Sequence, residues 1–239
     1  MTDLRQSAAM APSAARSGQP SLVAGLARLR EGSMLLLLVL LVATIFVVPA
    51  FLPEGTSLHV FADVMLTLIL ISGVLAIADH RKFALALAGI AVLVIVVRWA
   101  EWLVPPGALW TVRQVSSLGA CVLLASAVGI NVFAARRSVG DRVCGAIVLY
   151  LLLGLIAAFV YSALYTYDPG TFSKLPAGKG DIGDWLYFSF ITLTTLGYGD
   201  ITPVARTARS LAMLEGLVGQ LYPAIIIARF VSLPGNSKA

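Results

Sequence analysis

Long apolar runs constrain this chain more than any other feature, because each run approaches the length that crosses a lipid bilayer. The first run, "MLLLLVLLVATIFVVPAFL", covers residues 34–52 without a charged side chain. A helix needs about 20 such residues to span the hydrocarbon core. Further apolar runs lie near 61–78, 83–104, 115–135, 143–166 and 207–233. The sequence therefore predicts an all-α membrane protein with six transmembrane helices.

The composition agrees with this fold class. Of the 239 residues, 59% are hydrophobic and only 12% are charged, whereas a soluble domain is about 25% charged. The excess of 17 Lys and Arg over 12 Asp and Glu indicates membrane topology rather than nucleic-acid binding. Cys121 and Cys144 lie in apolar runs and are expected to be free thiols. We expect no enzymatic activity, no cofactor and no nucleic-acid partner.

The charges of the loops predict the orientation of the chain. The N-terminal tail and the loops around residues 79–82 and 135–142 are basic, whereas the loops at 52–59 and 104–110 contain neither Lys nor Arg. Basic loops stay on the cytoplasmic side of a membrane. With an even number of spans, both termini are expected in the cytoplasm. The connection between the fifth and sixth spans then faces outward.

That connection contains an apolar segment too short to cross the membrane. "WLYFSFITLTT" covers Trp185 to Thr195, and at 1.5 Å per residue it makes a helix of roughly 16 Å, about half a bilayer. Asp184 is expected to be its N-cap. The segment must enter the membrane and return on the same side, so a re-entrant helix is predicted.

The residues after this helix are "LGYGD", in which Gly197 and Gly199 flank Tyr198. Glycines at alternate positions permit backbone angles that other residues avoid, so that successive carbonyls can point to one side. The hydroxyl of Thr195 adds one more oxygen at the inner end. Four such strands around an axis would form stacked oxygen cages for a dehydrated cation. A single chain supplies one strand, so a homotetramer is predicted.

The stretch "TTLGYGD", residues 194–200, resembles the signature of the tetrameric potassium channel superfamily. The resemblance extends over 143–233 as outer helix, pore helix, filter and inner helix. It implies that K+ is coordinated at Thr195, Leu196, Gly197 and Tyr198, with Gly199 completing the filter at its outer mouth. The residues that it implies as filter support are Thr194, Asp200, Trp185, Tyr187 and Phe188. Among these, Trp185, Tyr187 and Phe188 would form an aromatic cuff around Tyr198.

The last span contains three residues that are unusual in an apolar helix. Gly219 lies twenty residues beyond Gly199, where the resemblance places a gate hinge. Pro223 removes a backbone hydrogen bond one turn later and could assist bending. Packing is the alternative for both, because Gly and Pro are frequent in membrane helices. Glu215 is a candidate buried carboxylate, either behind the pore helix, in the permeation path or in an outer polar pocket.

The first four spans resemble the peripheral domain of six-span channels in number and topology only. In the fourth span, Arg113 lies at the outer end, Arg136 and Arg137 lie at the inner end, and the residues between are uncharged. One charge moved through 100 mV supplies about 2.3 kcal/mol, so voltage gating is not expected. The expected domains are a disordered cytoplasmic tail (1–33), a peripheral domain (34–140), a pore domain (141–233) and a short cytoplasmic tail (234–239).

Together these features predict a multi-pass protein of the cell membrane, with a bacterial inner membrane as the expected location. Its partners would be K+, three further copies of itself and membrane lipids. The predicted function is passive, potassium-selective conduction. A nonconducting or regulatory channel subunit is one alternative. A subunit of a potassium uptake transporter is another, although such proteins carry four degenerate pore loops in one long chain.

Overall fold

The computed structural model describes residues 33–51, 56–76, 81–100, 103, 110–133, 139–173 and 182–232. Apart from Ser33, the two predicted cytoplasmic tails lie outside these residues. Half of the residues of the two basic loops also lie outside them, including Arg136 and Arg137.

The described residues form helices at each of the six predicted runs. The helices before the pore segment are α2 (Ser33–Val42), the π-helical η1 (Ala43–Val47), α3 (Val48–Phe51), α4 (Thr56–Ala76), α5 (Arg81–Ala100) and α6 (Trp110–Phe133). The remaining elements are α7 (Val139–Tyr167), the 3-10 turn η2 (Pro169–Thr171), β1 (Phe172–Ser173), α8 (Ile182–Leu193), β2 (Thr202–Pro203) and α9 (Arg206–Val231).

Within the described ranges, three helical segments are both long and apolar enough to cross a membrane, namely Trp110–Ile130, Gly140–Tyr167 and Arg206–Val231. Ser33–Val47, Val64–Val74 and Leu85–Ala100 are apolar helices of shorter length. The fold is therefore that of an all-α membrane protein.

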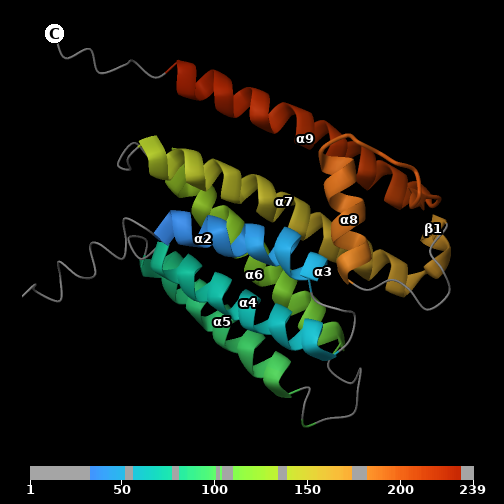
Figure 1. Cartoon of the computed structure of the whole chain (residues 1–239), viewed down its shortest axis with the longest axis horizontal. Helices are drawn as coiled ribbons and strands as arrows, with labels where there is room; N and C mark the ends of the chain where they lie inside the picture. Colours follow the sequence, from blue (N-terminus) through green and yellow to red (C-terminus); the bar gives the residue numbers. More distant parts are fainter. Residues whose placement is uncertain are drawn as a thin grey trace, which may run out of the picture.

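The long helices lie side by side with their axes roughly aligned, and α8 crosses them steeply between α7 and α9 (Figure 1). Helices α2, α4, α5 and α6 pack against their neighbours as a bundle, here called the N-terminal bundle. Helix α7 contacts α2 and α6 of this bundle and also contacts α8 and α9. Helix α7 is thus shared by the N-terminal bundle and the C-terminal part of the chain. The described residues from 139 to 232 are here called the pore module, after their predicted role.

The core of the N-terminal bundle is mainly aliphatic. Its buried side chains include Leu37, Leu41, Leu70, Leu87, Val94 and Leu124, and burying one such side chain contributes about 1.5–3 kcal/mol. The outward face is also apolar, since Leu85, Val92 and Val115 are exposed. Helices that are apolar on all sides are typical of membrane spans.

The first span changes its helical geometry near its end. Pro49 has no N–H to bond to the carbonyl of Ile45, four residues earlier, and the wider turns of η1 lie just before it. The hydroxyl of Thr44 donates to the carbonyl of Leu40 at 2.7 Å. The π-helical segment is therefore explained by a missing backbone donor. Phe46 in this segment packs edge-on against Phe190 of α8, with ring centroids 5.5 Å apart.

A two-stranded antiparallel ladder joins the chain after α7 to the chain before α9. Phe172 pairs with Pro203 and Ser173 with Thr202. Beside it, the N–H groups of Val204 and Ala205 both donate to the carbonyl of Thr171, at 2.8 and 3.2 Å. This ladder was not predicted from the sequence, and it ties the outgoing end of α7 to the start of α9.

Candidate functional site

The re-entrant segment forms helix α8, with bounds that differ from the prediction. It begins at Ile182 and ends at Leu193, so it starts three residues before Trp185 and stops before Thr195. The prediction of Asp184 as the N-cap is wrong, because Asp184 is the third residue of the helix. A carboxylate anywhere in the first turn of a helix interacts favourably with the positive end of the helix dipole. The sequence therefore indicated the correct turn for Asp184 but the wrong position within it.

Aromatic packing holds α8 against α7. The ring centroid of Trp185 lies 5.1 Å from that of Tyr165, and the ring centroid of Phe188 lies 4.9 Å from that of Tyr161. Gly154 of α7 permits close contact here, because a Cβ at this position would come within 2.9 Å of the Phe190 ring. Aromatic contacts therefore hold the pore helix against α7, and Gly154 leaves the space that the ring of Phe190 occupies.

Helix α8 ends in a Schellman motif that leads directly into the predicted filter. The N–H of Leu196 donates to the carbonyl of Ile191 and the N–H of Thr195 to that of Thr192, both at 2.9 Å. This pattern requires a left-handed residue after the helix, and Thr195 occupies that position with φ 60°. A left-handed conformation costs an L-residue about 1–2 kcal/mol, and such strain is typically found at functional sites.

The left-handed conformation recurs at every second residue of the motif. Thr195, Gly197 and Gly199 have φ of 60°, 54° and 75°. Thr195 is the only non-glycine residue with positive φ in the described part of the chain, so Leu196 and Tyr198 between them are not left-handed. The backbone of the predicted filter therefore alternates between left-handed residues and residues that are not left-handed, so it forms neither a helix nor a strand.

The outer end of the motif is fastened to the pore helix. The hydroxyl of Tyr187 donates to Oδ2 of Asp200 at 2.5 Å, and the N–H of Ile201 donates to Oδ1 at 3.0 Å. Two of the residues predicted to support the filter are therefore joined to each other.

The other predicted support residues face different surroundings. Trp185 and Phe188 are buried in the cluster between α7 and α8, whereas Tyr198 is 69% exposed in the single chain. Thr194 is exposed, and its hydroxyl donates to the carbonyl of Phe190 at 2.6 Å. The aromatic cuff around Tyr198 stays a prediction for an assembled channel.

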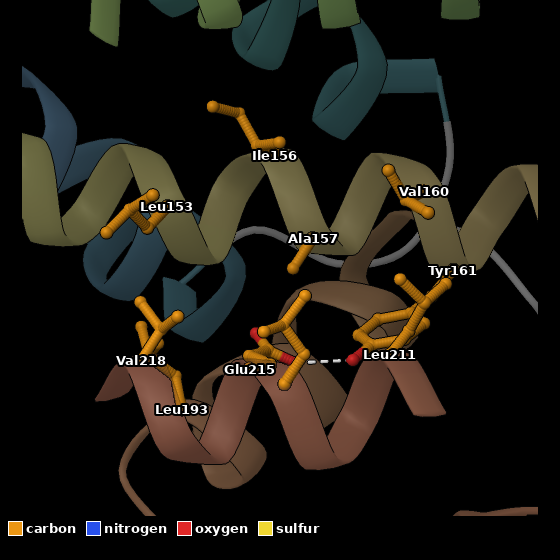
Figure 2. Close-up of a pocket in the computed structure, with 10 residues that line it drawn as sticks. Leu153, Ile156, Ala157, Val160, Tyr161, Leu193, Leu211, Glu215 and Val218 are labelled. Carbon is orange, nitrogen blue, oxygen red and sulfur yellow. Dashed lines mark hydrogen bonds between the residues drawn. The ribbon is translucent and has the colours of Figure 1, made fainter. Parts of the chain in front are cut away.

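Glu215 is buried where α7, α8 and α9 meet. The hydroxyl of Tyr161 donates to its Oε2 at 2.6 Å, and Oγ of Ser189 lies 2.5 Å from its Oε1. Figure 2 shows Tyr161 of α7 and Glu215 of α9 pointing toward one another across the space between the helices. These contacts place the carboxylate between α7, α8 and α9, and its position relative to a permeation path stays a prediction.

Sequence reasoning missed Tyr161 and Ser189 as partners of Glu215. A signal for Ser189 existed, since a hydroxyl and a carboxyl each stand in an otherwise apolar helix, and buried polar groups need hydrogen-bond partners. The sequence did not say which polar groups would meet.

The two predicted hinge residues lie inside a continuous helix. Helix α9 runs unbroken through Gly219 and Pro223. Gly219 contacts the end of the pore helix so closely that a Cβ there would lie 1.8 Å from the carbonyl oxygen of Leu193. One turn beyond, the hydroxyl of Tyr222 donates to the carbonyl of Ala146 of α7 at 2.8 Å. Gly219 therefore has a packing role, and its role as a hinge stays a prediction.

Comparison with known proteins gives several matches. A family model described as "Ion channel" matches residues 145–234. Protein LctB of Bacillus caldotenax is 35% identical over 120 residues, which cover 47% of this chain and 89% of that protein. Protein LctB of Geobacillus stearothermophilus is 36% identical over 86 residues, covering 34% and 62%. Two pore potassium channel c of Oryza sativa subsp. japonica is 35% identical over 88 residues, covering 36% and 19%.

The segment matched by the family model, 145–234, contains most of α7, all of α8 and α9, and the glycine motif between them. The chain covers most of the first LctB protein at 35% identity, although it covers only about a fifth of the plant channel. The fold of the site agrees with these matches. This chain belongs to the pore-loop ion channel family.

Proposed function

We propose that this protein is a potassium-selective channel that conducts K+ passively through a tetrameric pore. The observation that carries the proposal is the alternating backbone at Thr195, Gly197 and Gly199, placed at the end of a re-entrant helix. Alternation of hand lets successive carbonyl oxygens face one axis. Oxygen rings of this kind replace the hydration shell of K+. Leu196 and Tyr198 would contribute their carbonyls, and Thr195 its hydroxyl as well.

A homotetramer is part of the proposal, because one chain lines only one side of an axis. Helix α9 supports this assembly with an exposed apolar row, one turn apart at each step, formed by Met213, Leu217, Leu221 and Ile225. Large exposed apolar patches mark contact surfaces. In the tetramer this row would face neighbouring copies and the inner vestibule.

The proposed topology has six membrane spans in a bacterial inner membrane, with both termini in the cytoplasm. The start of α2, the start of α7 and the end of α9 lie at one end of the molecule (Figure 1), which supports a common side for these points. The pore helix then enters from the opposite, outer side. Potassium channel activity of the plant relative supports K+ as the permeant ion.

Gating by voltage is not part of the proposal. Helix α6 carries Arg113 in its first turn, and the residues from Gln114 to Phe133 are uncharged. With about 2.3 kcal/mol per charge per 100 mV, this helix cannot drive steep opening. Bending of α9 at Gly219 and Pro223 is proposed as the gate movement, since the missing N–H of Pro223 leaves the Gly219 carbonyl without its helical partner.

The test is ion flux from liposomes that contain only the purified full chain. We expect rapid efflux of K+ with little leak of Na+, and we expect Gly197→Ala to remove this discrimination. Equal leak of both ions from the unmodified protein would contradict potassium selectivity. Absence of flux would favour a nonconducting or regulatory subunit, and flux coupled to a second ion would favour an uptake transporter.

A further inference from the structure

Three short oxygen–oxygen contacts connect Tyr161, Glu215, Ser189 and Gly154 in series, and two of them involve Glu215. Its Oε2 lies 2.6 Å from the hydroxyl of Tyr161 and its Oε1 lies 2.5 Å from Oγ of Ser189. The same Oγ of Ser189 lies 2.7 Å from the carbonyl oxygen of Gly154. The contacts join α7, which supplies Tyr161 and Gly154, to the pore helix α8 and the inner helix α9.

Counting protons assigns the state of the carboxyl group. Three hydrogen bonds need three protons, and a carbonyl oxygen can only accept. The hydroxyls of Tyr161 and Ser189 supply one proton each. If Ser189 donates to Gly154, its contact with Glu215 needs a proton from the carboxyl. A neutral Glu215 therefore gives every contact its own proton, whereas an ionised Glu215 leaves two acceptors facing the single proton of Ser189.

The surroundings favour the same neutral state. Glu215 is only 8% exposed, and both partners of its carboxyl are hydroxyls rather than cations. Beside it lies a cavity of about 200 Å³ whose lining, apart from Glu215 and Tyr161, consists of aliphatic side chains of α7, α8 and α9 (Figure 2). A cavity with so few polar partners does not hold ordered water well, and an unpaired charge at this depth is costly.

The contact lies in register with the glycine contact one turn further along. Glu215 faces Ser189, and Gly219, four residues later, faces Leu193, four residues after Ser189. The close approach at Gly219, where a Cβ would lie 1.8 Å from the Leu193 carbonyl oxygen, brings the two helices near enough for the Glu215 bond. The filter begins two residues after Leu193. The inner helix is thus fastened to the last turn of the pore helix.

We propose that Glu215 is a positioning residue, a protonated carboxyl that fastens α9 and α7 to the pore helix and holds the base of the filter in place. It acts through Ser189 and does not contact the permeant ion. The inference rests on the proposed function for its effect on flux, but the protonation of Glu215 can be measured without any conduction.

The first test is infrared absorption of the purified full chain at neutral pH. The difference between the unmodified protein and Glu215→Gln should contain the carbonyl band of an undissociated carboxylic acid. A difference that instead contains only carboxylate bands would overturn the neutral state. Because this readout needs no ion flux, it stays informative even if the protein proves not to conduct potassium.

The second test is K+ flux of matched variants in liposomes. Gln at position 215 can donate to Ser189 and accept from Tyr161 as the neutral carboxyl does, so Glu215→Gln should keep the flux within about twofold. Glu215→Leu leaves two buried hydroxyls without this partner and should lower the flux about tenfold or more. Tyr161→Phe should lie between them, with Tyr167→Phe, at an exposed residue of the same helix, as its control.

Two results would overturn the positioning role. If Glu215→Gln lost as much flux as Glu215→Leu, the charge rather than the hydrogen bonds would matter. If Glu215→Leu and Tyr161→Phe both kept the flux of the unmodified protein, the contact would not hold the filter. An unmodified protein without selective flux would instead count against the proposed function, and the infrared result would still decide the state of Glu215.

Discussion

The N-terminal bundle and the pore module are built by different means. Bundle packing depends on aliphatic side chains such as Leu70, Leu87 and Leu124. The pore module adds aromatic contacts and directional hydrogen bonds, among them Tyr187 to Asp200 and Tyr161 to Glu215. Aliphatic cores tolerate substitutions that conserve volume, whereas a binding site needs its groups held within about 0.5 Å. The difference follows from what each region must do.

The family model agrees with this division, since all but the last two residues of its match, 145–234, fall within the range of the pore module. Changes in the pore module should therefore alter ion selection, and changes in the bundle should alter stability alone. Matched pairs of substitutions, one in each region, test this contrast.

The largest effect is expected at the filter. A Cβ at Gly197 would meet nothing within 4 Å in the chain, yet its φ of 54° strains any L-residue. Gly197→Ala should cost about 1–2 kcal/mol per copy, or about 4–8 kcal/mol in a tetramer, and should abolish the preference for K+ over Na+ in liposome flux. Gly119→Ala in α6 is the matched control, because its surroundings are equally open. Loss of selectivity in the control as well would break the contrast.

The next effect is a loss of stability in the bundle. Leu124 is buried in the core, and Leu124→Ala should lower the free energy of unfolding by about 2–5 kcal/mol. Thermal unfolding in detergent measures this change. The folded fraction should keep the ion preference of the unmodified protein, so a changed ratio of K+ to Na+ flux would show that the bundle also shapes the filter.

A smaller effect is expected at the contact between α8 and α9. Gly219→Ala drives a Cβ into the backbone of Leu193 and should cost about 1–3 kcal/mol or more, with reduced flux. In Gly73→Ala in the bundle, the new Cβ meets only side-chain carbons of Leu124, the nearest at 2.5 Å, and this side chain can rotate away. Thermal unfolding and flux of both variants measure the contrast. Equal changes of stability and flux in the two variants would mean that the backbone at the contact between α8 and α9 adjusts as easily as a side chain does.

The smallest effect is expected at the outer mouth. Tyr187→Phe removes the donor to Asp200 and should loosen the outer end of the filter, giving a smaller change in K+ flux than Gly219→Ala. Tyr167→Phe, at the exposed last residue of α7, is the control. A flux as high in Tyr187→Phe as in Tyr167→Phe would mean that the filter does not need the hydrogen bond between Tyr187 and Asp200.

Elements that depend on local sequence were predictable. The long apolar runs predicted the helices from α2 to α7 and α9, and an apolar segment of about half that length predicted the pore helix α8. Glycine spacing indicated an unusual backbone at Gly197 and Gly199. The left-handed Thr195 was missed, because a β-branched residue disfavours that conformation and only the end of α8 imposes it.

Elements that depend on contacts between distant residues were not predictable. The meeting of Glu215 with Ser189 and Tyr161 requires the register of three helices, which local patterns do not fix. The same holds for the contact of Gly219 with Leu193, where the sequence offered a hinge and packing as alternatives. The start of α8 at Ile182 was missed because Gly183 weakens the helical signal there.

The reversal potential in a planar bilayer tests the claim that the alternating backbone selects potassium. The bilayer contains only the purified full chain, with K+ on one side and Na+ on the other. We expect a reversal potential far from zero, with the sign that K+ permeation alone would give, and its collapse in Gly197→Ala. A reversal potential near zero in the unmodified protein would contradict the claim.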